Sequence, residues 1–136
     1  MRSTLIDAGP LIALFDKSDK YHFKALFFIK EFKGQLWSTW PVITEVCHLL
    51  DFNTQVQLNF LIWIKRGAVK LIDLDDQHLA RIIELTKKFN DVPMDLADAS
   101  LMVASEKISC LEIASVDSDF YIYRNIRNNY LTNIFM

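Results

Sequence analysis

The sequence predicts an α/β fold with a mostly parallel central sheet and helices on both faces of that sheet. Short runs rich in Ile, Leu and Val alternate with longer helical stretches along the 136 residues. Strands and helices that alternate at this spacing form right-handed crossovers between parallel strands. With three Gly and three Pro residues, the chain has little material for linkers, so a single domain over residues 1–136 is expected.

Five strands are predicted, at residues 2–6, 36–39, 68–74, 111–117 and 130–135. The first helix begins at Gly9-Pro10, because proline at the first helical position loses no needed hydrogen bond. Further helices are predicted at residues 21–33, 41–52, 54–65, 75–89 and 94–108. Gly34 follows the predicted helix 21–33 and Gly67 follows the predicted helix 54–65, and each glycine is expected to end its helix.

The composition favours a protein of the cytoplasm with no membrane partner. No apolar stretch approaches the roughly 20 residues of a membrane helix, and Asp7 and Pro10 interrupt the first apolar run, unlike in a signal peptide. Cys47 and Cys110 are isolated within apolar runs, without the paired spacing of a zinc site or a disulfide framework. Both cysteines are therefore expected in the core.

Two aspartates stand at the ends of predicted strands. Asp7 ends the first strand and Asp117 the fourth, and parallel sheets bind ligands beyond the carboxyl ends of their strands. Each also has an ordinary interpretation. Asp7 could be a turn residue, with the helix cap on Gly9, and Asp117 and Asp119 could form a turn or cap around Ser118.

Three more acids are candidates. Glu45 lies beside Val42 at the edge of the apolar arc of its helix, where an unpartnered carboxylate would be costly unless it is solvated. Asp95 and Asp98 are three residues apart at the start of a helix, which is also the spacing of a capping box.

A single metal-binding role explains all of these acids if their side chains lie close together in the fold. Two carboxylates about 4 Å apart repel by ~4 kcal/mol at an effective dielectric constant near 20, so a cluster needs a cation. Oxygen ligands favour Mg²⁺ or Mn²⁺ over zinc, and the three histidines are not spaced to join them. A divalent ion so held can activate water and stabilise a phosphoryl oxyanion, as in metal-dependent phosphodiester cleavage.

Four stretches carry a family resemblance, in the order LIDAGPLIALFD, TEVCHLL, MDLADASLMVASEKI and IASVDSDFYIYR. Together they resemble the four acidic motifs of the PIN domain family, in particular the VapC-like toxin ribonucleases of prokaryotic toxin–antitoxin pairs. The resemblance covers nearly the whole chain. It implies a three-layer α/β/α fold, an Mg²⁺- or Mn²⁺-dependent endoribonuclease acting on RNA, and an antitoxin protein as partner.

The resemblance also implies roles for individual acids. The metal-binding and catalytic acids would be Asp7, Glu45, Asp98 and Asp117, with Asp95 and Asp119 as neighbours that assist at the metal. One departure is Ala8: many family members have Ser or Thr there, so a hydroxyl that could hold a metal-bound water is missing. A lower rate is the expected consequence.

Basic residues close to the first and last motifs are candidates for RNA binding. The net charge of −2 becomes +3 once Asp7, Glu45, Asp98, Asp117 and Asp119 are set aside. Cations that could reach a phosphate backbone are Lys17, Lys20, Arg124 and Arg127. Each of them could equally be an ordinary solvated charge.

Two predicted helices, with the sequences YHFKALFFIKEF and VQLNFLIWI, are apolar around more than one face. Deeper burial would explain this, and so would a partner surface. The resemblance implies that these regions pair with a second copy and receive an antitoxin peptide. A homodimer is therefore expected, with Phe28 and Trp63 as aromatic anchors.

Two other functions compete with the ribonuclease. A non-catalytic PIN module that binds RNA or protein would not need all four acids, and a metal titration separates it from the enzyme. A receiver-like phosphorelay domain also combines acids with Mg²⁺, but it requires a lysine at the end of the last core strand. The run YLTNIF contains none.

Overall fold

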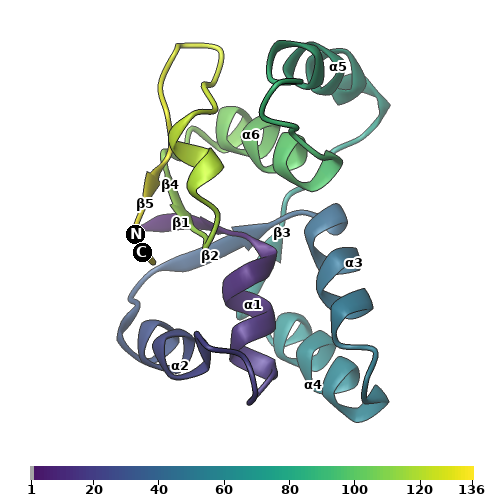
Figure 1. Cartoon of the computed structure of the whole chain (residues 1–136), viewed down its shortest axis with the longest axis vertical. Helices are drawn as coiled ribbons and strands as arrows, with labels where there is room; N and C mark the ends of the chain where they lie inside the picture. The colour runs from purple at the N-terminus through teal and green to yellow at the C-terminus, as the bar shows by residue number, and fades with distance from the viewer. Residues whose placement is uncertain (1) are drawn as a thin grey trace.

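A five-stranded sheet forms the middle layer of the protein in a computed structural model that describes residues 2–136 (Figure 1). The strands are β1 Ser3–Ile6, β2 Gln35–Ser38, β3 Val69–Leu71, β4 Glu112–Ala114 and β5 Thr132–Asn133. The helices are α1 Ala8–Phe15, α2 His22–Glu31, α3 Trp40–Leu49, α4 Thr54–Lys65, α5 Leu79–Lys88 and α6 Leu96–Ile108. Two 3₁₀ turns, η1 Asp76–His78 and η2 Ser118–Tyr121, complete the chain.

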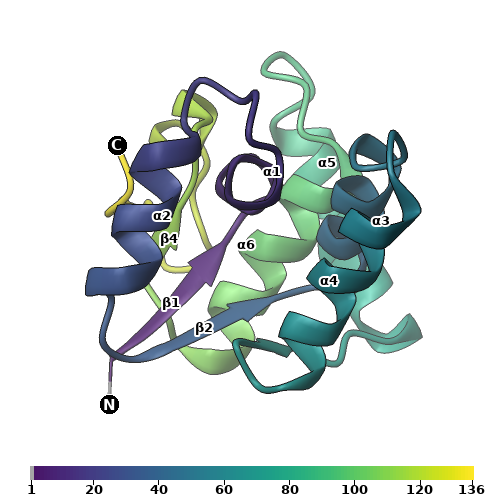
Figure 2. The same cartoon turned by 90° about the horizontal axis from the view of Figure 1, so that it is seen from below.

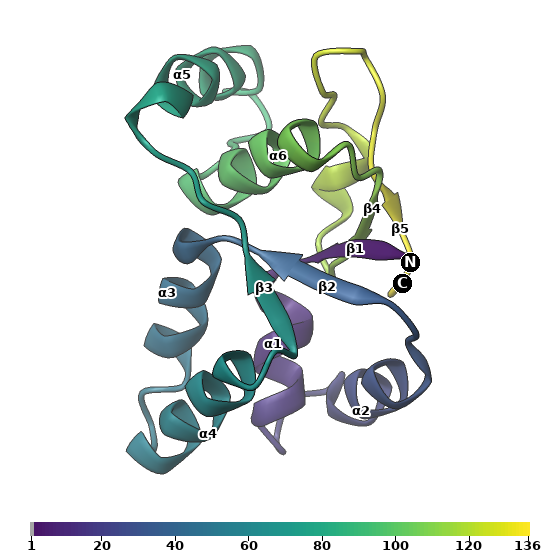
Figure 3. The same ribbon diagram turned by 180° about the vertical axis from the view of Figure 1, so that it is seen from behind.

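The sheet has the order β3-β2-β1-β4-β5, and each adjacent pair of strands is parallel. Helices α5 and α6 lie on one side of it, and α1 to α4 lie on the other (Figures 1 and 3). Looking along α1, Figure 2 shows α2 and α3 on its two sides, and both pack against it. The predicted three-layer α/β/α fold with a parallel sheet is confirmed.

Helix α6 forms the centre of its layer. Its residues 97–105 are all buried, because the sheet covers one side and α5 and the chain after β4 cover the others (Figure 1). This burial explains why the stretch is apolar on most of its circumference. No helix within residues 2–136 has the length and apolar character needed to span a bilayer.

Several predicted elements are longer than the observed ones. The predicted strand 111–117 ends at Ala114, and Asp117 belongs to the loop that leads into η2. The predicted strand 68–74 contains three paired residues, and the predicted helix 75–89 opens with a 3₁₀ turn. Helix 54–65 has the predicted bounds, because Asn53 caps its first turn by accepting from the amides of Gln55 and Val56.

The prediction that Gly9 caps the first helix is wrong. Asp7 is the cap: its backbone is extended, and its Oδ1 accepts from the amide of Ala8 at 2.8 Å. Gly9 lies inside the first turn and serves a packing role instead. A Cβ at Gly9 would lie 2.3 Å from Cγ2 of Val116, so glycine allows the loop before Asp117 to lie against α1.

The aromatic anchors predicted for self-association pack inward. Trp63 meets the ring of Phe15 edge-on, with centroids 5.5 Å apart, and Phe28 meets Phe135 in the same way at 5.5 Å. Both Trp63 and Phe28 are partly buried against the core, so they contribute to the packing of the single chain, and their role as interface anchors stays a prediction. The exposed apolar residues of these two helices are Phe23, Leu26, Phe27, Leu58, Leu61 and Ile62.

The cysteines agree with the core prediction in part. Cys110 is buried, and Cys47 is half-buried and packed against the core.

We expect Trp63→Glu to destabilise the fold, since it places a carboxylate beside Phe15 and removes the packing of the indole. The free energy of unfolding should fall by about 3 kcal/mol or more, the size typical of losing a large aromatic side chain from a core. Urea unfolding followed by circular dichroism measures this. Phe27→Glu is the matched control, because Phe27 is 67% exposed; equal stability of the two variants would contradict the inward packing.

Candidate functional site

Five of the six predicted acids line one cavity of about 220 Å³ beyond the carboxyl ends of β1 and β4. These acids are Asp7, Glu45, Asp95, Asp98 and Asp117. The apolar lining comes from Ala8, Gly9, Ile12 and Val116. Residues separated by up to 110 positions in the sequence thus meet at the sheet edge where parallel strands bind ligands.

The fold brings these acids together through four elements, which are β1, β4, α3 and α6. Strands β1 and β4 are parallel neighbours, and the amide of Asp7 donates to the carbonyl of Ala114 at 2.9 Å, so the chain segments after both strands stay side by side. Glu45 comes from the middle of α3, which packs against α1 and α6. Asp95 and Asp98 come from the start of α6.

Asp7 is buried and has hydrogen bonds to both carboxylate oxygens. Oδ1 accepts from the amide of Ala8 at 2.8 Å, and Oδ2 accepts from the hydroxyl of Ser115 at 3.0 Å. Burial, with smaller contributions from the charges of Glu45 and Asp117, raises the pKa of Asp7 to about 6 against the lowering effect of these two hydrogen bonds. The two hydrogen bonds therefore fix the orientation of the carboxyl group, and burial favours its protonated form.

Ser115 is a site residue that the sequence analysis missed. Its hydroxyl donates to Asp7 and accepts from the amide of Asp117 at 2.9 Å, so it links two of the acids. The side chain of Asn133 on β5 bonds both the amide and the carbonyl of Ser115. This serine supplies a hydroxyl at Asp7 although Ala8 has none, and its position two residues before Asp117 was the available signal.

Asp95 and Asp98 form the capping box that their spacing predicts. Asp95 Oδ1 accepts from the amide of Asp98 at 2.8 Å, and Asp98 Oδ2 accepts from the amide of Asp95 at 3.3 Å. The buried hydroxyl of Tyr123 also donates to Asp98 Oδ2, at 3.2 Å. Burial, together with the charges of Asp95, Asp7 and Asp117, raises the pKa of Asp98 to about 8. Capping and lining the cavity are therefore compatible roles.

The remaining acids differ in how they are held. Glu45 is half-buried, and its pKa is raised by burial and by the charge of Asp95. Asp117 Oδ1 accepts from the amide of Asp119 at 2.8 Å, which caps η2 and confirms the turn interpretation. Asp119 is not part of the cavity lining; burial and the charge of Asp117 raise its pKa.

The carboxylates surround the cavity without closing on a single point. Within residues 2–136, no three Asp, Glu, His or Cys side chains are grouped tightly enough to hold a metal ion as they stand. The donor set is nevertheless entirely oxygen, and two of its members are buried beside other acids. These are the ligand types that Mg²⁺ and Mn²⁺ prefer, so the residues fit such an ion by chemistry.

None of the four predicted RNA-binding cations lines this cavity. Lys17 and Lys20 follow the far end of α1, whose eight residues extend about 12 Å from Asp7. Arg124 donates to the carbonyls of Tyr121, Ile122 and Tyr123, so its guanidinium holds the chain after η2.

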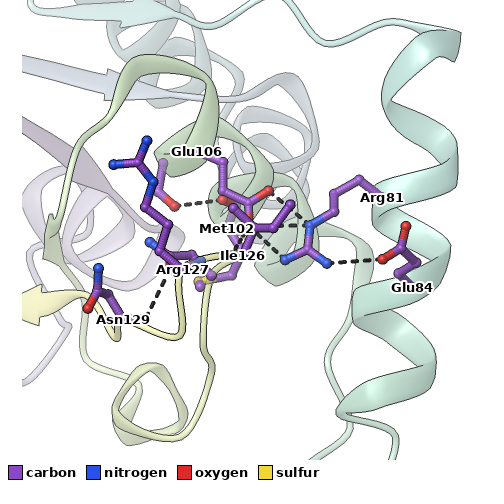
Figure 4. Close-up of polar contacts among 9 residues, drawn as sticks. Arg81, Glu84, Met102, Glu106, Ile126, Arg127 and Asn129 are labelled. Atoms are coloured by element: carbon purple, nitrogen blue, oxygen red, sulfur yellow. Dashed lines mark hydrogen bonds and ion pairs between the residues drawn. The ribbon is translucent and has the colours of Figure 1, made fainter.

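Arg127 lines a separate pocket that also contains Glu106 and Asn129 (Figure 4). The structure therefore brings the acids together and leaves the basic residues dispersed.

Comparison with known proteins identifies the family. The family model described as the PIN domain matches residues 4–125, and the chain belongs to this family. Among solved structures, VapC20 of Mycobacterium tuberculosis, described as a toxin that cleaves the sarcin-ricin loop, has a similar fold with a TM-score of 0.80. The match has 14% sequence identity and covers 88% of this chain and 93% of VapC20. No curated protein sequence matches the chain at a significant level.

The raised pKa values of Asp7 and Asp98 predict a pH dependence of stability. In the unfolded chain both carboxyls ionise near pH 4, whereas in the folded chain their pKa values are about 6 and about 8. Above pH 4 the folded state therefore binds more protons than the unfolded state, and stability falls as the pH rises toward 8. With a chelator present, the melting temperature should be lower at pH 8.5 than at pH 5.

Asp98→Asn removes the carboxyl with the larger of the two pKa shifts. The melting temperature of this variant should therefore change less between pH 5 and pH 8.5 than that of the wild type, and it should exceed the wild-type value at pH 8.5. The exposed Asp51 offers a control, since Asp51→Asn should keep the slope of the wild type. Scanning calorimetry on the three proteins decides the matter. A steep loss of stability in Asp98→Asn at both pH values would mean that capping is the main role of this carboxylate.

Proposed function

We propose that this chain is a metal-dependent endoribonuclease of the VapC type that hydrolyses RNA phosphodiester bonds and acts in the cytoplasm as the toxin of a toxin–antitoxin pair. The observation that carries the proposal is the gathering of five acids from four parts of a PIN fold around one cavity. The similar fold of VapC20, a toxin described as cleaving the sarcin-ricin loop, supports it.

The ion would be Mg²⁺ or Mn²⁺, and its ligands would come from Asp7, Glu45, Asp98 and Asp117. Asp95 would add charge beside them, and Asp119 would act by holding Asp117. When bound, the ion supplies a lowered pKa for its water and positive charge for the phosphoryl oxyanion. An ion at this position would also offset the repulsion between the acids, which adds to the effect of burial in raising the pKa values of Asp7 and Asp98.

The chain's own residues would orient the reacting groups. Asp7 has both oxygens fixed by hydrogen bonds, and Ser115 couples its direction to that of Asp117. Glu45 is half-buried, and no hydrogen bond to its carboxylate occurs within residues 2–136. That freedom suits Glu45 to accept a proton from an attacking water.

The partners would be RNA, an antitoxin protein and a second copy of the chain. Lys17, Lys20 and Arg127 are exposed and are proposed to contact phosphates at the edges of the RNA site. Arg124 is half-buried and would contribute mainly by holding the chain after η2. The apolar side chains exposed on α2 and α4 are the proposed contact surfaces for the antitoxin or the second copy.

We expect the purified protein to cleave single-stranded or structured RNA in the presence of Mg²⁺ or Mn²⁺ and to stop when EDTA is in excess. Asp7→Asn and Asp98→Asn should each reduce the rate by at least about 100-fold, the upper range for loss of a group that supports a bound metal. Gel electrophoresis of labelled RNA, including an oligonucleotide of the sarcin-ricin loop, measures the cleavage.

The exposed Asp51 again provides the control, and Asp51→Asn should cleave at the rate of the wild type. Equal cleavage with and without EDTA would refute a metal mechanism. Tight RNA binding with no cleavage under either condition would favour the non-catalytic PIN module.

A further inference from the structure

Two hydrogen bonds engage one oxygen of Asp98 and leave the other without a donor among the described residues. The hydroxyl of Tyr123 donates to Oδ2 at 3.2 Å, and the amide of Asp95 donates to the same atom at 3.3 Å. No donor to Oδ1 occurs within residues 2–136. Since Asp98 lines the acidic cavity, Oδ1 is the oxygen left for a ligand there.

The ring of Tyr123 is held rigidly. It is fully buried, and it meets Phe89 and Phe120 edge-on, with centroid distances of 5.4 and 5.3 Å. Phe89 follows the end of α5, and Phe120 belongs to η2. The aromatic contacts alone would keep the ring in place, so the hydroxyl can be removed without disturbing the packing.

A second contact holds the chain that carries Tyr123. The carboxylate of Glu106 on α6 accepts from the amide of Ile126 at 2.7 Å, and also from Nε and Nη2 of Arg81 on α5 at 2.9 and 2.7 Å (Figure 4). Charge-assisted pairs with this two-point geometry are strong and directional. Glu106 therefore connects α5, α6 and the chain after η2. Its contact with that chain is at Ile126, three residues after Tyr123.

The turn beyond Tyr123 is closed by its own hydrogen bonds. Asn125 Oδ1 accepts from the amides of Arg127 and Asn129, and the amide of Asn125 donates to the carbonyl of Asn129. The turn is thus a compact loop fixed at Glu106.

We propose that Tyr123 is a positioning residue that holds Asp98 in the orientation for metal binding, and that Glu106 is a positioning residue for the chain that carries Tyr123. The inference rests on the proposed metal-dependent function and extends it to residues outside the acidic cavity. Groups that hydrogen-bond to a metal ligand typically change metal affinity or activity by about 10- to 100-fold when they are removed.

The test uses the full chain and compares Tyr123→Phe with Tyr121→Phe. Tyr121 lies in the same segment but is 47% exposed, so it is the matched control for loss of a hydroxyl. Mn²⁺ binding is measured by electron paramagnetic resonance of the free ion, which does not depend on activity. Tyr123→Phe should bind Mn²⁺ about tenfold or more weakly, whereas Tyr121→Phe should match the wild type.

Kinetics give a second readout. Tyr123→Phe should lower kcat at fixed Mn²⁺ while the KM for RNA stays within about twofold, and high Mn²⁺ should restore part of the loss. A hydroxyl with a purely structural role would change the melting temperature of the metal-free protein and leave Mn²⁺ affinity intact, which would overturn the proposal.

Glu106→Gln and Glu84→Gln extend the comparison, because Arg81 contacts both glutamates but only Glu106 also binds the loop. Glu106→Gln should weaken Mn²⁺ binding severalfold, and Glu84→Gln should not. If Tyr123→Phe fails to fold, this pair decides the question. A wild type that neither binds Mn²⁺ nor cleaves RNA would refute the proposed function itself, whereas normal Mn²⁺ affinity in Tyr123→Phe would refute the positioning role alone.

Discussion

Burial of like charges at one edge of the sheet is the constraint on which the rest of the site depends. Asp7 and Asp98 are each less than a tenth exposed, and both line a cavity with three other acids. Burial disfavours the charged form of both carboxyls and is the main reason for their raised pKa values, and the charges of the neighbouring acids add to it. Buried acids of this kind lower the stability of the fold, and they are typical of sites where the charges bind a ligand.

The protein tolerates this cost because four of the five acids, all except Glu45, hydrogen-bond to nearby backbone amides. Asp7, Asp95 and Asp117 cap the elements that begin after them, and Asp98 closes the capping box of α6. The same bonds stabilise the first turns and set the direction of the carboxylates. Stability and site geometry therefore depend on the same hydrogen bonds, so capping and metal binding are complementary interpretations of these residues.

The layers, the parallel sheet and the gathering of acids at its carboxyl edge could be predicted, because they follow from patterns along the chain. Contacts between distant segments could not. Nothing near Trp63 indicates that Phe15 covers it, and nothing near Tyr123 indicates that its hydroxyl reaches Asp98. Gly9 was misread as a cap because its real constraint, Val116, is more than a hundred residues away. The roles proposed for the individual acids remain predictions.

The most direct test of this account is a crystal structure of the full chain grown with Mn²⁺ and measured at the manganese absorption edge. The account predicts an anomalous peak inside the cavity lined by Asp7, Asp98 and Asp117, with oxygen ligands at about 2.1–2.2 Å, close to the distances of Mg²⁺. A cavity without such a peak at millimolar Mn²⁺, while the acids keep the positions described above, would contradict it.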